Sequence, residues 1–305
     1  MRELHWQGAD CTALYGRIFE PEGAADRLPL LCLPGLTRNG RDFDQLADAL
    51  AGHPETPRAV ITMDYRGRGR SGHADAASYT PQVEADDVRR GLLAAGIDRC
   101  AVLGTSRGGL IAALLAMLPP ATSGLGIGPV ILNDIGPVIE VAGLLRIRAG
   151  IDLLTGAGAP QTWPAAEALM LKLQGGAFPN VRGDELAAVT RQLFRDEGGH
   201  PVADFDPALL ATLASLSPET PLPPLWPMFL ALGQMRRTAG SAPEPRPLLV
   251  LRGALSDVLS EATLAEMQRL LPHLETQVVA DQGHAPLLRD DATIARIADF
   301  LNGVD

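Results

Sequence analysis

Cysteine is scarce in this sequence, which has only Cys11, Cys32 and Cys100 among its 305 residues. Three is a small and odd number, so it argues against a disulfide framework. All three stand in strand-like apolar runs of the sequence. We therefore expect buried thiols and a protein of the reducing cytoplasm.

Long apolar runs and an excess of basic charge are also missing. No apolar run approaches the roughly 20 residues needed to cross a bilayer, and we see no signal peptide at the N-terminus. The 26 Lys and Arg residues are outnumbered by 36 Asp and Glu, for a net charge of −10. This balance argues against nucleic acid or an anionic membrane surface as the main partner. We expect a small-molecule substrate, and the sequence leaves the oligomeric state open.

Spacings typical of metal sites are absent as well. The sequence has no H-x-x-x-H motif and no closely paired cysteines. A zinc enzyme would need ligands at such spacings. We predict neither a metal site nor a cofactor.

Strand-like and helix-like segments alternate through much of the chain. Hydrophobic residues make up 46% of it and charged residues 20%, which is enough for a well-buried core. The predicted strands are Thr12–Phe19, Leu28–Leu33, Arg58–Met63, Cys100–Leu103, Pro129–Leu132, Pro247–Leu251 and Thr276–Ala280. The predicted helices among them are Asp42–Leu50, Val83–Ala95, Leu110–Leu118, Glu261–Leu271 and Ala292–Leu301. This alternation predicts an α/β fold with a doubly wound, mostly parallel sheet.

The alternation breaks in the middle of the chain. Residues 138–244 contain no clear apolar strand and are rich in Pro, Ala, Leu and Gly, with helical stretches at Ala165–Leu173 and Asp184–Phe194. We therefore predict a core made of residues 1–137 and 245–305. A mainly helical insertion interrupts it.

The most informative motif is Gly104-Thr105-Ser106-Arg107-Gly108, which lies between an apolar strand and an apolar helix. A G-x-S-x-G motif in this position predicts a sharp turn that holds the serine in a strained conformation, with its hydroxyl above the sheet. Side chains in place of the two glycines would clash where the strand and the helix approach each other. We predict that Ser106 is a catalytic nucleophile.

A serine nucleophile needs a neighbouring base, and histidine usually supplies it. Among the six histidines, His284 follows the last predicted strand, in a Gly-His-Ala-Pro loop. Active sites of open α/β sheets gather in the loops at the carboxyl ends of the strands. We predict that His284 is the base.

The acid that orients the histidine should lie between the serine and the histidine in the chain, at another strand end. Asp257 follows the predicted strand Pro247–Leu251, and Asp134 follows the predicted strand Pro129–Leu132. We favour Asp257 because its strand is next to the one that bears His284. Asp134 remains the alternative.

Acyl transfer also needs two donors for the oxyanion of the tetrahedral intermediate. We predict the backbone N–H groups of Arg107, directly after the nucleophile, and of Leu36, in the loop after the predicted strand Leu28–Leu33. Gly35 lets the backbone of this loop approach closely. Arg38 stands beside it, where it can touch substrate.

Taken together, these motifs resemble the α/β-hydrolase fold superfamily over residues 10–136 and 245–303. The resemblance extends to the D-x-R-G-x-G-x-S sequence at Asp64–Ser71, a structural signature in such proteins. It implies that the insertion is a cap over the active site. Its aromatic residues, Trp163 and Trp226 among them, are then candidates for a substrate pocket or for the core of the cap.

The function that we predict is a cofactor-free serine hydrolase for a small, largely apolar ester, thioester or lactone. Two alternatives use the same residues: a carbon–carbon bond hydrolase of ring-cleavage products, and a cofactor-free perhydrolase or haloperoxidase. A third belongs to another class, a binding protein that keeps the triad without using it. The identity of the substrate is set by cap residues that the sequence does not place.

Overall fold

The computed structural model of the chain describes residues 1–21, 27–219, 222–235 and 244–304. Its centre is an eight-stranded sheet in the order β1-β2-β4-β3-β5-β6-β11-β12. Strands β1 and β2 are antiparallel to their neighbours, and the other six run parallel. The strands are β1 (Arg2–Gln7), β2 (Ala13–Phe19), β3 (Leu30–Leu33), β4 (Val60–Asp64), β5 (Arg99–Thr105), β6 (Gly126–Asn133), β11 (Leu248–Gly253) and β12 (Glu275–Val279). The predicted doubly wound, mostly parallel sheet is confirmed.

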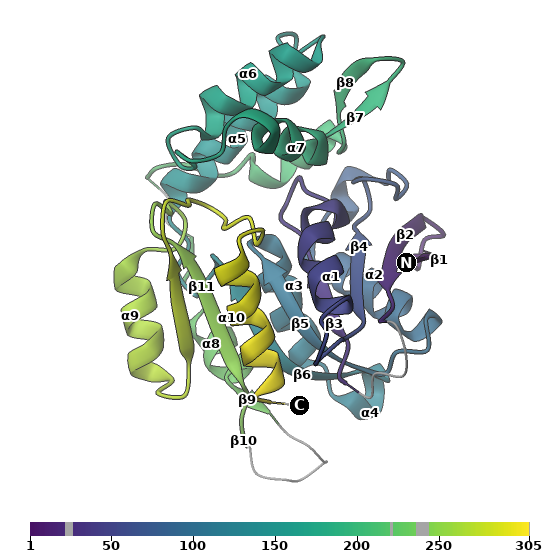
Figure 1. Ribbon diagram of the computed structural model, residues 1–305, viewed down its shortest axis with the longest axis vertical. Helices are drawn as coiled ribbons and strands as arrows, with labels where there is room; N and C mark the ends of the chain where they lie inside the picture. Colours follow the sequence, from purple (N-terminus) through teal and green to yellow (C-terminus); the bar gives the residue numbers. More distant parts are fainter. Residues whose placement is uncertain (22–26, 220–221, 236–243, 305) are drawn as a thin grey trace.

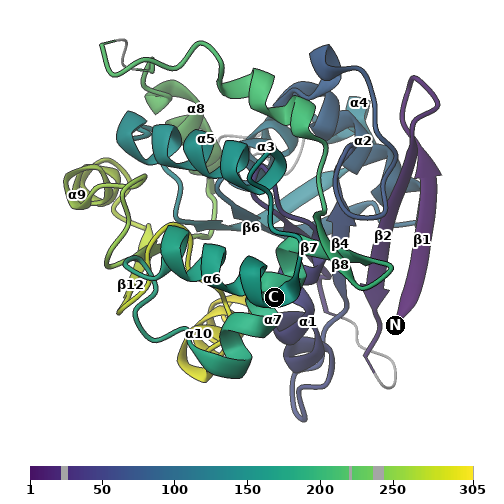
Figure 2. The same cartoon turned by 90° about the horizontal axis from the view of Figure 1, so that it is seen from above.

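Helices cover both faces of the sheet, as the view from above shows (Figure 2). One face packs against α2, α3, α8 and α9, and the other against α1 and α10. Their bounds are α1 (Asp44–Ala51), α2 (Pro81–Ala94), α3 (Arg107–Met117), α8 (Trp226–Leu232), α9 (Glu261–Leu270) and α10 (Asp291–Asn302), with the short α4 (Pro120–Ser123) between α3 and β6. Two 3-10 turns, η1 (Gly40–Phe43) and η2 (Ala76–Ser78), precede α1 and α2.

Several helices begin where the sequence supplies a capping side chain. Thr80 accepts from the N–H of Val83 at the start of α2, and Ser260 accepts from the N–H of Thr263 at the start of α9. Such caps satisfy backbone donors that have no partner inside the helix. Within the described ranges, no helix is both long and apolar enough to cross a membrane.

The N-terminal edge of the sheet differs from the prediction. Strand β1 was not foreseen, because Leu4 is its only buried residue and an edge strand with one buried side chain has little apolar pattern. Cys11 lies exposed in the turn between β1 and β2, with a φ of 65°, so the expectation that it is buried was wrong. Cys32 in β3 and Cys100 in β5 are buried, as expected.

Most of the segment between β6 and β11 lies above the carboxyl ends of the parallel strands (Figure 1). Its elements there are α5 (Val141–Thr155), α6 (Trp163–Gln174), α7 (Gly183–Leu193), β7 (Phe194–Glu197), β8 (His200–Ala203) and the 3-10 turn η3 (Pro207–Leu213). They share a hydrophobic core of their own. The hairpin β7–β8 was not predicted; it turns on Gly198 and Gly199, both with positive φ.

The last part of that segment returns to the body of the protein. Phe229 and Leu232 of α8 are buried in the same hydrophobic cluster as α3, and the short strands β9 (Gln234–Met235) and β10 (Glu244–Pro245) follow. The division of the chain into a core and a cap of residues 138–244 remains a prediction. The packing of α8 places its residues with the core helices.

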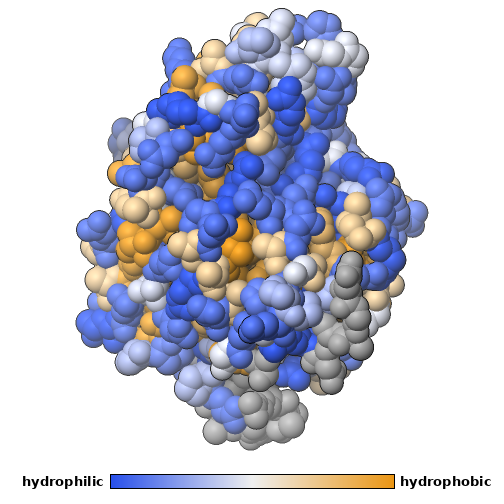
Figure 3. All heavy atoms as spheres, in the orientation of Figure 1, coloured by the Kyte–Doolittle hydropathy of each residue, from blue (hydrophilic) through white to orange (hydrophobic). Residues whose placement is uncertain are grey.

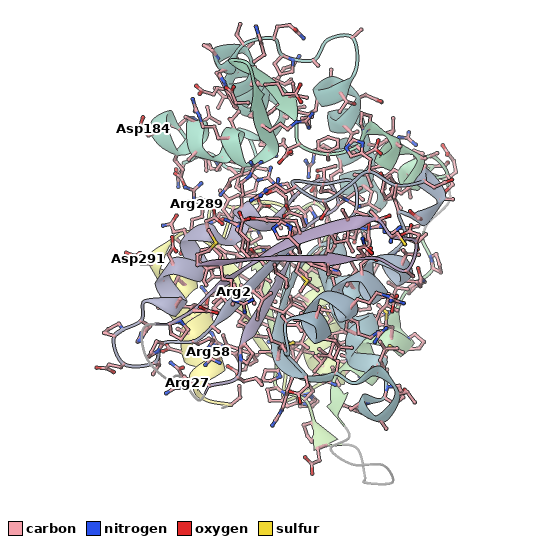
Figure 4. The ribbon with its side chains drawn as sticks, turned by 90° about the vertical axis from the view of Figure 1, so that its right-hand side faces the viewer. Arg2, Arg27, Arg58, Asp184, Arg289 and Asp291 are labelled. Carbon is pink, nitrogen blue, oxygen red and sulfur yellow. The ribbon has the colours of Figure 1, made fainter. Side chains whose placement is uncertain are left out.

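Polar contacts join the chain at the end of the sheet far from α7. The side-chain carbonyl of Asn302, the last residue of α10, accepts from Arg27 at 3.2 Å and from Arg58 at 3.3 Å. In Figure 4 the two arginines lie at the lower end of the molecule, whereas Asp184 of α7 lies near the top.

The strand β5 and the helix α3 touch through glycine. A Cβ added to Gly104 would lie 2.4 Å from the carbonyl oxygen of Gly108, and one added to Gly108 would lie 2.2 Å from that of Leu33. Both contacts are far shorter than backbone can tolerate. The predicted close approach of strand and helix is therefore confirmed.

We expect Gly108→Ala to lower the free energy of unfolding by about 1–3 kcal/mol, because the added methyl group pushes α3 away from β3. Urea denaturation measures the effect. The matched control is Gly150→Ala in α5, where an added Cβ meets nothing within 4 Å and alanine favours the helix. Equal stabilities of the two variants would contradict this account of the glycine motif.

Candidate active site

Three parallel strands end at the same level and set out the site. Thr105 at the end of β5 pairs with Asn133 of β6, which pairs in turn with Leu251 of β11. Ser106 and Asp134 are the first residues after β5 and β6. Their N–H groups continue the ladder, Ser106 to Asn133 at 3.0 Å and Asp134 to Leu251 at 2.8 Å. The two side chains therefore leave adjacent strand ends.

Ser106 has the strained backbone that the G-x-S-x-G motif predicts. Its φ of 52° and ψ of −116° lie outside the helical and extended regions, and α3 begins at the next residue. The positive end of the dipole of α3 is thus directed at the space around the serine hydroxyl.

His284 reaches Ser106 because the loop after β12 turns back over the sheet. The side chain of Asn133 donates to the carbonyl of Pro286 at 2.9 Å, which fixes this loop above the end of β6. Nε2 of His284 then lies 2.9 Å from Oγ of Ser106, and Nδ1 lies 2.7 Å from Oδ2 of Asp134. An ionised carboxylate only accepts, so Nδ1 carries the proton and Nε2 is free to accept from the serine.

The predicted partner of the histidine, Asp257, is therefore wrong, and Asp134 takes its place. Asp257 points instead to Arg146 of α5, whose Nε and Nη2 donate to its two oxygens at 2.6 and 2.8 Å. The strand before Asp257 is indeed the neighbour of β12. The loop after β12 crosses the end of β11 and brings His284 over β6, and strand order does not reveal this path.

Asp134 is fully buried, and three donors surround its carboxylate. Besides His284, the N–H of Gly253 donates to Oδ1 at 2.9 Å and the hydroxyl of Ser256 donates to Oδ2 at 2.6 Å. Charge-assisted hydrogen bonds of this kind offset the cost of removing a carboxylate from water. The loop after β11 thus supports the acid through Ser256, one residue before the one that we predicted.

Leu36 and Arg107 stand where donors to an oxyanion are expected. A Cβ added to Gly35 would lie 3.9 Å from Cβ of Ser106, so the loop after β3 passes close to the serine. Among the described residues, the backbone N–H groups of Leu36 and Arg107 donate to no other group. Both are therefore available to a ligand. The side chain of Arg107 turns away, to Glu84 and the carbonyl of Tyr79.

A cavity of about 170 Å³ opens at Ser106 and His284, between the sheet and the helices above it. Its floor includes Gly35, Leu36 and Arg38 from the loop after β3. Its roof is mainly apolar and comes from α5, α6, α7 and the loop between α6 and α7: Ile147, Ile151, Leu154, Met170, Leu173, Phe178, Val189 and Leu193. Figure 3 shows the face of the protein seen in Figure 1 as largely hydrophilic, with residues of apolar character gathered in patches below the upper helices.

The two predicted tryptophans do not line the cavity. Trp163 packs on the core of the upper helices, donates to Asp196 at 3.0 Å and lies under the guanidinium of Arg191. Trp226 belongs to α8 and stacks edge-on against Phe229, with ring centres 6.0 Å apart. Their substrate-binding assignment was wrong, because large aromatics at these positions complete hydrophobic cores.

The cavity residues of α5, Arg146 among them, are not predicted from the sequence. The segment Val141–Thr155 forms a long helix, yet only Gly143, Ile151 and Leu154 are buried in it. So sparse a buried face gives a weak periodic signal.

Comparison with known proteins identifies the family. The chain matches the alpha/beta hydrolase family over residues 30–297. It belongs to this family. The resemblance noted from the sequence is thereby confirmed, and so is an enzyme of the hydrolase class.

Individual relatives of this alpha/beta hydrolase cover nearly its whole length. It is 32% identical over 281 residues to a 3-hydroxybutyrate-oligomer hydrolase of Cupriavidus necator, which covers 90% of this chain and 88% of the relative. An alpha/beta hydrolase structure from Novosphingobium aromaticivorans has a TM-score of 0.82 at 33% identity, over 99% of this chain and 98% of that one. A diacylglycerol lipase of Mus musculus is 26% identical over 86% of this chain and 77% of its own.

The signature sequence Asp64–Ser71 of this alpha/beta hydrolase forms buried ion pairs beside the site. Arg66 pairs with Asp87 at 2.7 Å, and Arg68 pairs with Glu84 at 2.8 Å, all of them buried. Arg66 and Arg68 therefore have structural partners, as expected from the resemblance.

Glu84 joins the two predicted oxyanion residues. One of its oxygens faces Arg68, and the other accepts from Nε of Arg107 at 2.6 Å. Arg68 also donates from Nε to the carbonyl of Leu36 at 2.8 Å. A single buried carboxylate thus connects the loop after β3 with the start of α3.

We expect Glu84→Gln to lower the free energy of unfolding by about 3 kcal/mol or more, because two arginines then lose their buried counter-charge. Chemical denaturation gives the value. Glu266→Gln breaks an exposed pair with Arg269 and serves as the control, for which we expect almost no change. If Glu84→Gln is as stable as this control, the network is not structural.

Proposed function

We propose that this alpha/beta hydrolase cleaves a short carboxylic ester through an acyl-enzyme formed on Ser106. One observation carries the proposal: Ser106, His284 and Asp134 form a continuous hydrogen-bonded chain whose serine end opens into a cavity. A serine with a base at hydrogen-bond distance, and a carboxylate behind that base, is the arrangement that activates a hydroxyl for attack.

In the proposed mechanism, Oγ of Ser106 attacks the ester carbonyl while Nε2 of His284 takes its proton. Asp134 stabilises the imidazolium that results. The N–H groups of Leu36 and Arg107 hold the oxyanion. The intermediate then expels the alcohol, which receives the proton from His284. Water then attacks the carbonyl of the acyl-enzyme while His284 takes its proton. The second tetrahedral intermediate expels Oγ of Ser106, which receives that proton, and the acid is released.

The size and polarity of the cavity support a short substrate. Its volume of about 170 Å³ is close to that of a protein cavity of about 150 Å³ that holds one benzene molecule. Its apolar roof suits alkyl groups. We therefore propose a small-molecule ester with a short acyl chain, cleaved without a cofactor.

The names of two relatives agree with a hydrolytic reaction at this site. One is a hydrolase of 3-hydroxybutyrate oligomers, and the other is a lipase. The first of them covers nearly the whole of both chains, so its similarity includes the segment that roofs the cavity.

We expect a fluorophosphonate probe to label the wild-type protein with one equivalent, and to leave Ser106→Ala unlabelled. The probe reacts only with a serine whose hydroxyl is activated by a base. Mass spectrometry of the intact protein, and of the peptide that contains residue 106, measures the adduct. The control is Thr105→Ser, which keeps a hydroxyl at residue 105 and leaves the turn at Ser106 unchanged. We expect this variant to be labelled like the wild type.

An unlabelled wild type would favour the binding-protein alternative, in which the triad is not used. Labelling of Ser106→Ala at another residue would contradict the assignment of the nucleophile.

We expect Asp134→Asn to lower kcat for p-nitrophenyl acetate by about 10⁴-fold, since the amide no longer holds His284 in the required tautomer. Asp257→Asn removes a carboxylate that pairs with Arg146 and has no hydrogen bond to His284, so it should lower kcat by only about threefold or less. Stopped-flow or steady-state assays at pH 7.5 give both values. The opposite order of effects would restore Asp257 as the acid.

A further inference from the structure

One arginine in the cavity wall has a carboxylate partner that does not itself line the cavity. Besides His284, its charged lining residues are Arg38, Asp42 and Arg146. Arg38 and Asp42 pair with each other through two contacts of 2.8 and 2.6 Å, so their charges cancel within the wall. Arg146 also has a carboxylate partner, Asp257, but Asp257 does not line the cavity.

The ion pair with Asp257 orients Arg146 without using all of its donors. Nε and Nη2 of Arg146 donate to the two carboxylate oxygens of Asp257. Within the part of the chain that the structure describes, Nη1 has no hydrogen-bond partner, and 39% of the side chain is exposed. A guanidinium held on one edge by a carboxylate keeps two N–H groups for an acceptor on the other.

We propose that Arg146 binds a carboxylate of the substrate, so that the preferred ester is an anion. This inference rests on the proposed function, because it assigns the substrate class for the same cavity. The arginine stands on α5, above the sheet, whereas the nucleophile stands at the end of β5. In this proposal the carboxylate is a group separate from the scissile ester, and the alkyl segment between them packs against the apolar roof.

A carboxylate fits this wall better than a phosphate group does. A phosphate monoester carries a charge of about −1.5 to −2 at neutral pH. One guanidinium, two of whose five N–H donors already serve Asp257, does not balance that charge. A single carboxylate carries a smaller charge, and it takes two of the three N–H donors that Arg146 keeps.

Two pairs of compounds test the proposal, and each pair compares a carboxylate with the neutral amide of nearly the same size. Monomethyl glutarate and its primary amide carry the group on the acyl side of the ester. 3-Acetoxybutyrate and its primary amide carry it on the alcohol side. Calorimetry with Ser106→Ala, which does not consume these esters, measures Kd for all four compounds. The double variants add Arg146→Gln or, as matched control, Arg148→Gln on the same helix outside the cavity.

We expect at least one acid to bind tenfold or more tightly than its amide, and the pair that shows this identifies the side of the ester that bears the charge. Arg146→Gln should reduce the preference to about unity, and Arg148→Gln should keep it. Equal binding of acids and amides, or a preference that survives Arg146→Gln, would overturn the proposal. Loss of the preference for the acid in Arg148→Gln would also overturn it, because any positive charge on α5 would then explain the preference.

Turnover of the same esters by the wild type separates this inference from the proposed function. If acids bind through Arg146 but no ester is hydrolysed in a Ser106-dependent reaction, the proposed function fails and the anion site stands. If the esters are hydrolysed without regard to charge, the anion site fails and the proposed function stands.

Discussion

The imidazole of His284 is the point at which three distant parts of the chain meet. It accepts from Ser106 after β5 and donates to Asp134 after β6, while its own loop comes from β12 at the far edge of the sheet. Without the crossing of that loop, held by the hydrogen bond from Asn133 to Pro286, serine and acid would be neighbours with no base between them. The hydrogen-bonded chain therefore depends on the path of a loop as much as on the sheet.

The surrounding structure keeps these groups in place with buried contacts. Glycine lets α3 approach β5 and β3 closely, and this sets the direction of Ser106. Ser256 and Gly253 hold Asp134 on one side of the site. On the other side, Glu84 pairs with Arg68 and Arg107. Groups fixed before substrate arrives lose little free energy to reorganisation when charge develops.

The sequence predicted those features that depend on local pattern. The strand–turn–helix around Ser106 and the loop of His284 carry their signals in a few adjacent residues, and both lie where expected. The parallel sheet followed from the alternation of apolar strands and helices. Strand β1 was not predicted because only one of its residues is buried. Helix α5 was not predicted because few of its residues are buried.

The choice between Asp134 and Asp257 lay beyond local pattern. Both aspartates follow a strand of the same sheet, and only the return of the loop after β12 decides which one meets His284. The same limit applies to Trp163 and Trp226, since hydrophobicity does not tell a pocket wall from a core. Arg146 stands opposite Asp257 because two separate segments approach each other in space.

The central claim is that turnover passes through an acyl-enzyme on Ser106, and the most direct test is the mass of the protein quenched during turnover. Acid quenching within milliseconds of mixing with p-nitrophenyl butyrate, followed by mass spectrometry, should reveal one butyryl group on the peptide that contains Ser106. Asp134→Asn should slow its appearance. Turnover of this ester with no acylated enzyme at any time, or with the acyl group on another residue, would contradict the account.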